Sequence, residues 1–284
     1  MKKTLIILFS LFFFNSSNAD ISSFVSNLIP GEGITETSVE LRDDNNGGGN
    51  YEFSILGVRD VLSKENSNLF TQFSLHTQEV NSDQRFIGNL GLGYRVLSED
   101  KLMMYGGNIF WDQDISEGHQ RLGFGLEGKA LMLDFSYNKY VKATNQKVIS
   151  GTKEQALSGD EYNIGSQVPY MPWATFNYQS YKWDNEKAVS DQKGKIYSLE
   201  TILTPSLHFN IEKDNSGNNG VKDQHNYKLV YVYPPNNNKP SLMDGALASV
   251  AFEKRNMKAS LKDKVRRNNN LAVEIQGSVI FTSK

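Results

Sequence analysis

Apolar and polar residues alternate along most of the chain. Between about residue 36 and residue 234, short segments place an apolar side chain at every second position, with Gly, Ser, Asn, Gln or a charged side chain between them. In one segment Leu90, Leu92 and Tyr94 alternate with two glycines and Arg95. A repeat of two residues is the pattern of a β-strand. The whole stretch therefore predicts an all-β fold of about twelve antiparallel strands.

The two faces of these strands favour a transmembrane β-barrel. One face is apolar with aromatic residues at its ends, which is typical of a band that faces lipid. The other face carries glycines and polar or charged residues, which line a wet lumen more readily than they fill a dry core. A soluble β-sandwich also alternates, so the pattern alone leaves that fold open.

The connections between the strands differ in length in a regular way. Short turns alternate with long polar connections, the short ones including 98–100 and 169–172 and the long ones 43–50, 142–160, 184–191 and 213–224. Short turns at one rim and long loops at the other are typical of outer-membrane barrels. An even number of strands would leave both ends of the barrel at the short-turn, periplasmic rim.

Both ends of the chain depart from the alternating pattern. Lys2 and Lys3, the apolar run 5–14 and the small residues up to Ala19 predict a secretory signal peptide over residues 1–19. We expect a periplasmic segment over 20–35 and the barrel over 36–234. Residues 235–284 would form a linker helix and a short C-terminal β-stub.

The predicted linker helix is strongly basic. Residues 241–267 contain no Gly or Pro after Gly245 and carry a narrow apolar stripe at helical spacing. Between Glu253 and Arg267 the sequence contains seven basic residues and only two acidic ones. On the residues alone a solvated surface helix is the simpler interpretation. The other is a plug in a lumen whose predicted acidic residues are Glu127, Asp134, Glu200 and Glu212.

The composition of the chain excludes several kinds of functional site. The chain has no cysteine, which excludes disulfides, thiolate catalysis and Cys-type zinc sites, and its net charge of −2 gives no reason to expect nucleic acid as a partner. His119 lies near Asp112 and Asp114 in the sequence, so an Asp/His pair is conceivable. No nucleophile has a context that singles it out, and the two aspartates lack further cation ligands. We expect hydrogen bonding rather than catalysis there, and no cofactor or metal.

Four segments carry a more specific signal than the alternation. They are residues 69–72 (LFTQ), 89–95 (NLGLGYR), 105–114 (YGGNIFWDQD) and 119–127 (HQRLGFGLE). In this order and spacing they resemble the inverse autotransporter β-domain of the intimin and invasin family. Residues 265–274 resemble, more weakly, the segment that follows the barrel in that family. The motif residues that we single out are Asn108, Asp112, Asp114, His119, Gln120 and Arg121.

The resemblance implies a barrel in the cell outer membrane of a Gram-negative bacterium. It also implies that this barrel takes part in type V secretion. It implies a C-terminal linker that passes outward through the pore, which places the basic helix inside the lumen. We then expect lumen charge pairs among Arg95, Arg121, Glu127 and Asp134, with Glu200 and Glu212 also facing the lumen. From the linker we expect contacts by Lys254, Arg255, Lys258 and Lys262.

The resemblance also implies partners: outer-membrane lipid, the barrel-assembly machinery and periplasmic chaperones. Family adhesins continue into a surface passenger, whereas this sequence stops at Lys284. We therefore expect a translocation and anchoring domain without its passenger, and the sequence specifies no surface ligand. A plugged channel or porin is the alternative, and an outer-membrane hydrolase is a third.

Overall fold

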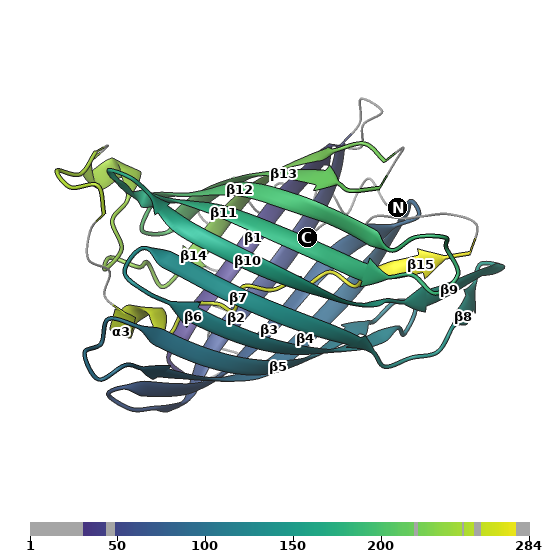
Figure 1. Ribbon diagram of the computed structural model, residues 1–284, viewed down its shortest axis with the longest axis horizontal. Helices are drawn as coiled ribbons and strands as arrows, with labels where there is room; N and C mark the ends of the chain where they lie inside the picture. Colours follow the sequence, from purple (N-terminus) through teal and green to yellow (C-terminus); the bar gives the residue numbers. More distant parts are fainter. Residues whose placement is uncertain (1–30, 44–48, 219–220, 246, 253–256, 277–284) are drawn as a thin grey trace.

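A computed structural model describes residues 31–43, 49–218, 221–245, 247–252 and 257–276. Twelve of its strands form a closed antiparallel barrel, which confirms the predicted fold (Figure 1). The predicted signal peptide, most of the segment 20–35, and Lys254 and Arg255 lie outside the described residues. None of the helices in the described ranges is long and apolar enough to cross a membrane.

The wall follows the order of the chain. Its strands are β1 (Gly33–Asp43), β2 (Gly49–Ser63), β3 (Ser67–Val80), β4 (Asp83–Leu97), β5 (Met104–Asp114), β6 (Gln120–Lys129), β7 (Leu133–Lys142), β10 (Ser158–Val168), β11 (Met171–Asp184), β12 (Gln192–Thr204), β13 (Leu207–Ser216) and β14 (Gln224–Tyr233). Each pairs with the next, β7 pairs with β10, and β1 closes the barrel against β14.

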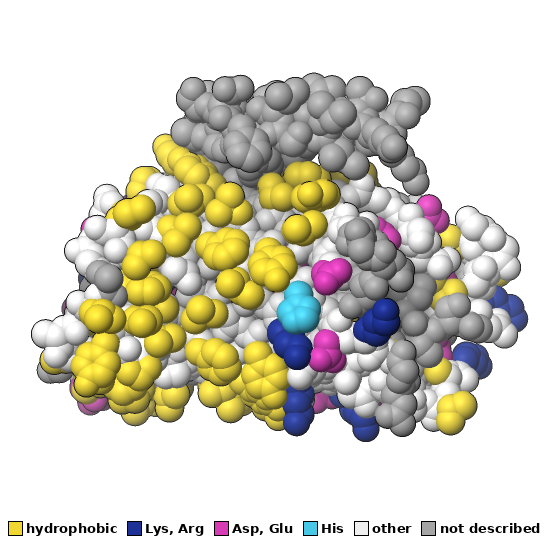
Figure 2. Space-filling model, turned by 90° about the horizontal axis from the view of Figure 1, so that it is seen from above, with side chains coloured by type: hydrophobic (Ala, Val, Ile, Leu, Met, Phe, Trp, Pro, Cys, Tyr) yellow, Lys and Arg dark blue, Asp and Glu magenta, His cyan; other side chains and the backbone are white. Residues whose placement is uncertain are grey.

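Alternating side chains give the wall a lipid face and a lumen face. Leu126 exposes 64% of its surface on the outside, whereas the adjacent Glu127 exposes 8% on the inside. Figure 2 shows a broad hydrophobic band that gives way to charged side chains along one border. On the outward face Tyr178 lies between Tyr162 and Tyr197, with ring centroids 6.1 Å and 5.5 Å apart.

The two rims differ as the connection lengths predict. The short turns between β2 and β3, β4 and β5, β6 and β7, β10 and β11, and β12 and β13 share one rim with the start of β1 and the end of β14. We call this the short-turn rim and the opposite one the long-loop rim. One connection at the long-loop rim is short: the turn between β3 and β4 has only two residues. In it Asn81 and Ser82 adopt positive φ angles of 51° and 65°.

The region 142–160 holds more structure than the predicted polar connection. It contains β8 (Lys147–Ile149) and β9 (Thr152–Ala156), which form a hairpin. A third strand, β15 (Val273–Ile275), pairs with β9 and completes a small sheet separate from the wall. The predicted alternation after residue 271 is thus a strand over these three residues, and residues 277–281 lie outside the described ranges.

The predicted helix over 241–267 is largely wrong. The described residues of this stretch contain only a 3-10 turn, η1 (Leu242–Asp244), and one helical turn, α3 (Met257–Ser260). A short helix near the C-terminus is present, but residues 261–272 are not helical. The narrow apolar stripe reflects contact with the barrel wall instead, since Met257 and Leu261 pack against Leu97 and Met104.

Glycines on the inner face of β4 let aromatic rings lie flat along the wall. A Cβ atom at Gly91 would come within 2.4 Å of the Phe110 ring, and one at Gly93 within 2.3 Å of the Phe70 ring. Each ring in turn carries a guanidinium group 4.2 Å from its centroid, Arg267 over Phe110 and Arg95 over Phe70. The glycines therefore make room for cation–π contacts in the lumen.

We predict that Gly91→Ala destabilises the folded barrel by about 1–3 kcal/mol, because Phe110 and the arginine above it must move. The measurement is the temperature at which the barrel in detergent loses its fast-migrating band on a gel. Gly107→Ala is the matched control, since the nearest atom to its new Cβ would lie 3.7 Å away. Equal band-loss temperatures for the two variants would contradict the prediction.

Candidate functional site in the barrel lumen

The C-terminal segment crosses the lumen from one rim to the other. We call residues 257–272 the linker. It starts with α3 at the short-turn rim and reaches β15 at the long-loop rim (Figure 1). Its path is set by side chains of the barrel wall that bind its backbone.

Strand β3 contacts the linker at three points along its length. The pairs are Asn68 Nδ2 to the Leu261 carbonyl (3.2 Å), the Val265 amide to Gln72 Oε1 (2.7 Å), and the Leu271 amide to Gln78 Oε1 (2.8 Å). Every pair is separated by 193 residues in sequence. The linker therefore advances one residue for each residue of β3.

This one-to-one register explains why the linker is not a helix. A strand rises about 3.3 Å per residue and an α-helix about 1.5 Å. A helix would need more than twice as many residues to follow the same length of β3. Only an extended chain can pass three successive amide side chains at this spacing.

Strands β6, β7 and β10 bind the middle of the linker. Asn138 donates to the Arg266 carbonyl at 3.0 Å. The Asn268 amide lies 2.8 Å from both the Tyr140 hydroxyl and Glu161 Oε1, while Arg121 donates to the Asn268 carbonyl at 2.9 Å. Polar wall residues thus replace the hydrogen bonds that a helix would make within itself.

A buried charge cluster lies at the centre of these contacts. Asp112 is fully buried between Arg121 at 2.8 Å and Arg267 of the linker at 2.7 Å. Asn89 also donates to Asp112, at 2.7 Å. The Arg121 guanidinium lies over the Tyr140 ring, 4.1 Å from its centroid. Asp112 therefore joins the wall and the linker through charge-assisted hydrogen bonds.

A second arginine of the wall, Arg95, binds the linker backbone nearer the short-turn rim. Arg95 makes a two-point contact with Glu127, at 2.8 Å and 3.1 Å, and donates with its other nitrogen to the carbonyls of Leu261 and Asp263. Glu127 neutralises the guanidinium, while the two carbonyls accept hydrogen bonds from its third nitrogen. The wall thereby fixes the point at which α3 gives way to extended chain.

Ion pairs join the rest of the linker to the barrel. They are Lys262 with Glu32 and Asp60 (2.8 Å each), Lys264 with Glu36 (2.7 Å), Arg266 with Glu200 (2.6 Å), and Asp263 with Lys129 (2.6 Å) and Lys239 (2.8 Å). At the short-turn rim the Asp263 carboxylate raises the pKa of Lys239. Each linker charge from 262 to 267 therefore has an opposite charge on another part of the chain.

The predicted lumen residues are placed as follows. Arg95 pairs with Glu127, whereas Arg121 pairs with Asp112 rather than with Glu127 or Asp134. Asp134, Glu200 and Glu212 line a cavity of about 570 Å³ beside the linker. Of the predicted linker contacts, Lys262 reaches Asp60 at the edge of the lumen, and Lys258 is exposed.

The motif residues spread over both faces of the wall. Asn108 faces the lumen, where its amide oxygen would lie 2.4 Å from a Cβ at Gly125. Gln120 donates to Gln113 at 2.6 Å on the outer side. Asp114 pairs with Arg85 at 3.2 Å, and buried His119 lies 3.3 Å from Glu154. Asp112 and Asp114 thus face arginines, and the described residues contain no group of three His, Asp or Glu placed to hold a metal.

Sequence reasoning missed many of the residues that hold the linker in the lumen. The wall residues it did not single out are Asn68, Gln72, Gln78, Asn89, Asn138, Tyr140 and Glu161, and the linker residues are Lys264, Arg266 and Arg267. The available signal was amide side chains recurring at lumen positions of β3. Such residues could equally line a water-filled pore, so the pattern alone did not reveal a bound backbone.

Comparison with known proteins agrees with the resemblance seen in the four motifs. A family model described as "Inverse autotransporter, beta-domain" matches residues 17–269. This match confirms the predicted family and places the barrel in the outer membrane of a Gram-negative bacterium. The short-turn rim is accordingly periplasmic and the long-loop rim extracellular.

Individual relatives and one solved structure show the extent of the likeness. The inverse autotransporter adhesin YeeJ of Escherichia coli K12 is 27% identical over 245 residues, 77% of this chain and 10% of that protein. Intimin of Escherichia coli O127:H6 is 25% identical over 211 residues, 70% of this chain and 22% of intimin. A structure from a study of in-meso crystallization of membrane proteins shares the fold, with a TM-score of 0.68, 21% identity, and coverage of 85% of this chain and 99% of the other. The chain thus spans less than a quarter of either relative.

We predict that Asp112→Asn weakens the folded state by about 3–5 kcal/mol, because two buried arginines lose their shared carboxylate. The band-loss temperature on gels should fall, and the linker should become open to protease in detergent. Glu65→Gln removes an exposed ion pair with Lys101 at the rim and serves as the control, with no shift expected. A stable Asp112→Asn barrel with a protected linker would refute the cluster's role.

Proposed function

The chain belongs to the inverse autotransporter β-domain family, and we propose that its barrel anchors it in the outer membrane while the linker carries the C-terminal segment to the cell surface. The observation that carries this proposal is the continuous path of the linker. It enters at the periplasmic rim, is bound by β3 at Asn68, Gln72 and Gln78, and leaves at the extracellular rim.

The nature of the linker contacts supports anchoring. They bind mainly backbone groups of the linker, and the charges from 262 to 267 are paired. Backbone contacts fix the position of a chain along the pore, and buried ion pairs resist its sliding, because movement by one residue would leave charges unpaired in the lumen. A barrel built in this way holds its linker in one register.

A plugged channel is the second candidate, and one observation favours it. The cavity of about 570 Å³ beside the linker is lined by charged and polar residues, among them Glu40, Glu52, His76 and Lys228. A polar cavity of this size holds water. The barrel would then act as a narrow pore beside the linker, in addition to or in place of display.

We also infer that the chain performs no covalent catalysis. The family comprises adhesion and translocation domains rather than enzymes. The His119 and Asp112 side chains that suggested a catalytic pair are engaged with Glu154 and with arginines respectively. Their proposed role is to fix the wall and its linker.

The proposed partners follow from the place of the barrel in the membrane. Outer-membrane lipid would contact the apolar band, and the barrel-assembly machinery and periplasmic chaperones would deliver and insert the chain. A surface ligand would belong to whatever segment the linker presents, and its chemistry is left open.

We predict that an epitope tag after Lys284 is stained by antibody on intact Gram-negative cells and removed by external protease. A tag inserted at Glu99 in a periplasmic turn should stay protected until the outer membrane is permeabilised, and a tag at Lys222 in an extracellular loop should behave like the C-terminal one. If the C-terminal tag behaves like the tag at Glu99, display is refuted and the plugged channel becomes the working function.

A further inference from the structure

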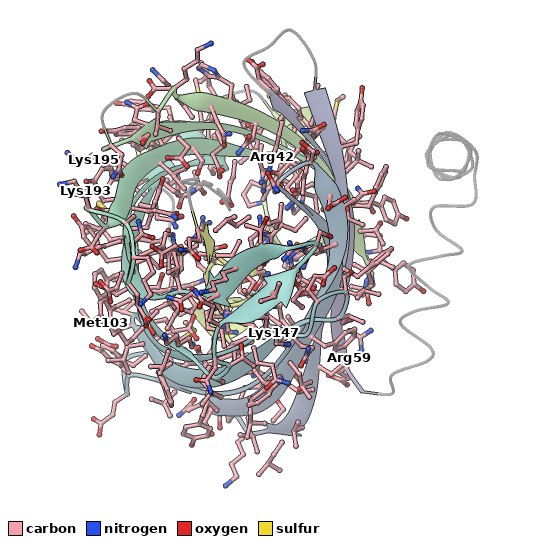
Figure 3. All side chains as sticks on the ribbon, turned by 90° about the vertical axis from the view of Figure 1, so that its right-hand side faces the viewer. Arg42, Arg59, Met103, Lys147, Lys193 and Lys195 are labelled. Atoms are coloured by element: carbon pink, nitrogen blue, oxygen red, sulfur yellow. The ribbon has the colours of Figure 1, made fainter. Side chains whose placement is uncertain are left out.

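The extracellular mouth of the barrel is crossed by β-strands rather than by mobile loops. The β8–β9 hairpin leaves the wall between β7 and β10 and lies across the opening, where Lys147 marks it in Figure 3. Strand β9 pairs there with β15, which follows directly from the linker. The mouth therefore contains three strands, and β15 lies more than a hundred residues from β8 and β9 in the sequence.

Two apolar clusters seal this strand pair against the wall. On one side Ala156 of β9 and Leu271, Val273 and Ile275 of the C-terminal segment pack with Val80 and Ile87. On the other side Leu157 and Ala272 pack with aromatic residues, which include Tyr140, Tyr181 and Trp183. All of these residues expose at most 6% of their surface. Two buried apolar clusters thus hold the strand pair at the mouth of the barrel.

A buried ion-pair network fixes the hairpin to the wall. Glu154 of β9 receives two hydrogen bonds from Arg85 of β4, one of them at 2.8 Å, and lies 3.3 Å from His119. Arg85 also contacts Asp114 of β5 at 3.2 Å. Glu154 exposes 2% of its surface, so the contact is shielded from water and salt.

A second carboxylate fixes the neighbouring loop to the linker's exit strand. Glu274 of β15 accepts hydrogen bonds from three successive backbone amides, those of Glu186, Lys187 and Ala188, at 2.9, 2.9 and 2.7 Å. Gln155 of β9 donates to the same carboxylate at 3.2 Å. Consecutive amides that converge on one anion form a specific binding site for it. Glu274 thereby ties the β11–β12 loop to both strands in the mouth.

We propose that the β8–β9 hairpin is a gate that the linker itself closes. The inference rests on the proposed function, because β15 reaches the mouth only once the chain has passed through the pore. Strand β9 and Arg85 supply one half of the closed state. The C-terminal segment supplies the other half, namely the apolar residues from Leu271 to Ile275 and the Glu274 carboxylate. Passage of the chain and sealing of the membrane are thus one event.

The test is the single-channel conductance of the purified full-length chain in planar lipid bilayers. Wild-type protein is expected to stay closed for most of the recording. Glu154→Gln and Glu274→Ala should each raise the open probability about tenfold or more, because each removes charge-assisted hydrogen bonds made only in the closed state. Glu99→Gln, in a periplasmic turn, is the matched control and should conduct like wild type.

A reversible lock gives an independent arm. Ala156 and Val273 face each other across β9 and β15, next to the hydrogen-bonded pair of Leu157 and Ala272. Residues in such a non-bonded pair have Cα atoms about 4.5 Å apart, within reach of a disulfide. The chain has no cysteine of its own. Ala156→Cys with Val273→Cys in the Glu154→Gln background should close the pore when oxidised and reopen it when reduced.

Two results would overturn the gate. One is a Glu274→Ala or Glu154→Gln barrel that folds, as judged by its heat-dependent gel shift, yet conducts no more than Glu99→Gln. The other is conductance of the double-cysteine protein that does not respond to oxidation. Surface staining of a tag after Lys284 in the same variants separates this from display: a stained tag with unchanged conductance refutes the gate alone, and a protected tag refutes the proposed function.

Discussion

A backbone that crosses a membrane must find hydrogen-bond partners inside the protein. Both the barrel wall and the linker cross the membrane, and each satisfies this constraint in a different way. The wall meets it by pairing strand with strand until β1 closes against β14, which leaves no free edge. The linker satisfies the same constraint although most of its backbone is not paired with a β-strand. Amide, hydroxyl and guanidinium groups of the wall, such as those of Gln72, Tyr140 and Arg121, bind its amides and carbonyls instead.

The barrel was predictable because its signal is repeated in every strand. Each strand alternates between lipid and lumen, so a single apolar residue that faces inward, such as Phe110, does not hide the pattern. The charges at Arg95 and Glu127 could also be assigned to the lumen from alternation. Their pairing could not, because cross-strand register decides it: Arg95 meets Gly106 on β5, and Glu127 reaches across from β6.

The linker was mispredicted because its backbone partners are distant in sequence. Residues 257–267 have helical spacing of Met257, Leu261 and Val265, and a single-chain pattern cannot show that Asn68 and Gln72 will bind that backbone. Tertiary contacts overrode local propensity. The β8–β9 hairpin was missed for a related reason, since its strand Thr152–Ala156 pairs with β15, which lies more than a hundred residues away in the sequence.

The distribution of polarity along the pore connects these features. Beside the linker the lumen holds a cavity lined largely by polar and charged side chains. At the mouth the wall also turns apolar side chains inward, among them Val80, Ile87 and Trp183. An apolar ring open to water would be costly, and it becomes stabilising only when Leu271 and Val273 arrive to cover it. Burial of this apolar surface therefore stabilises the position of the linker that the structure shows.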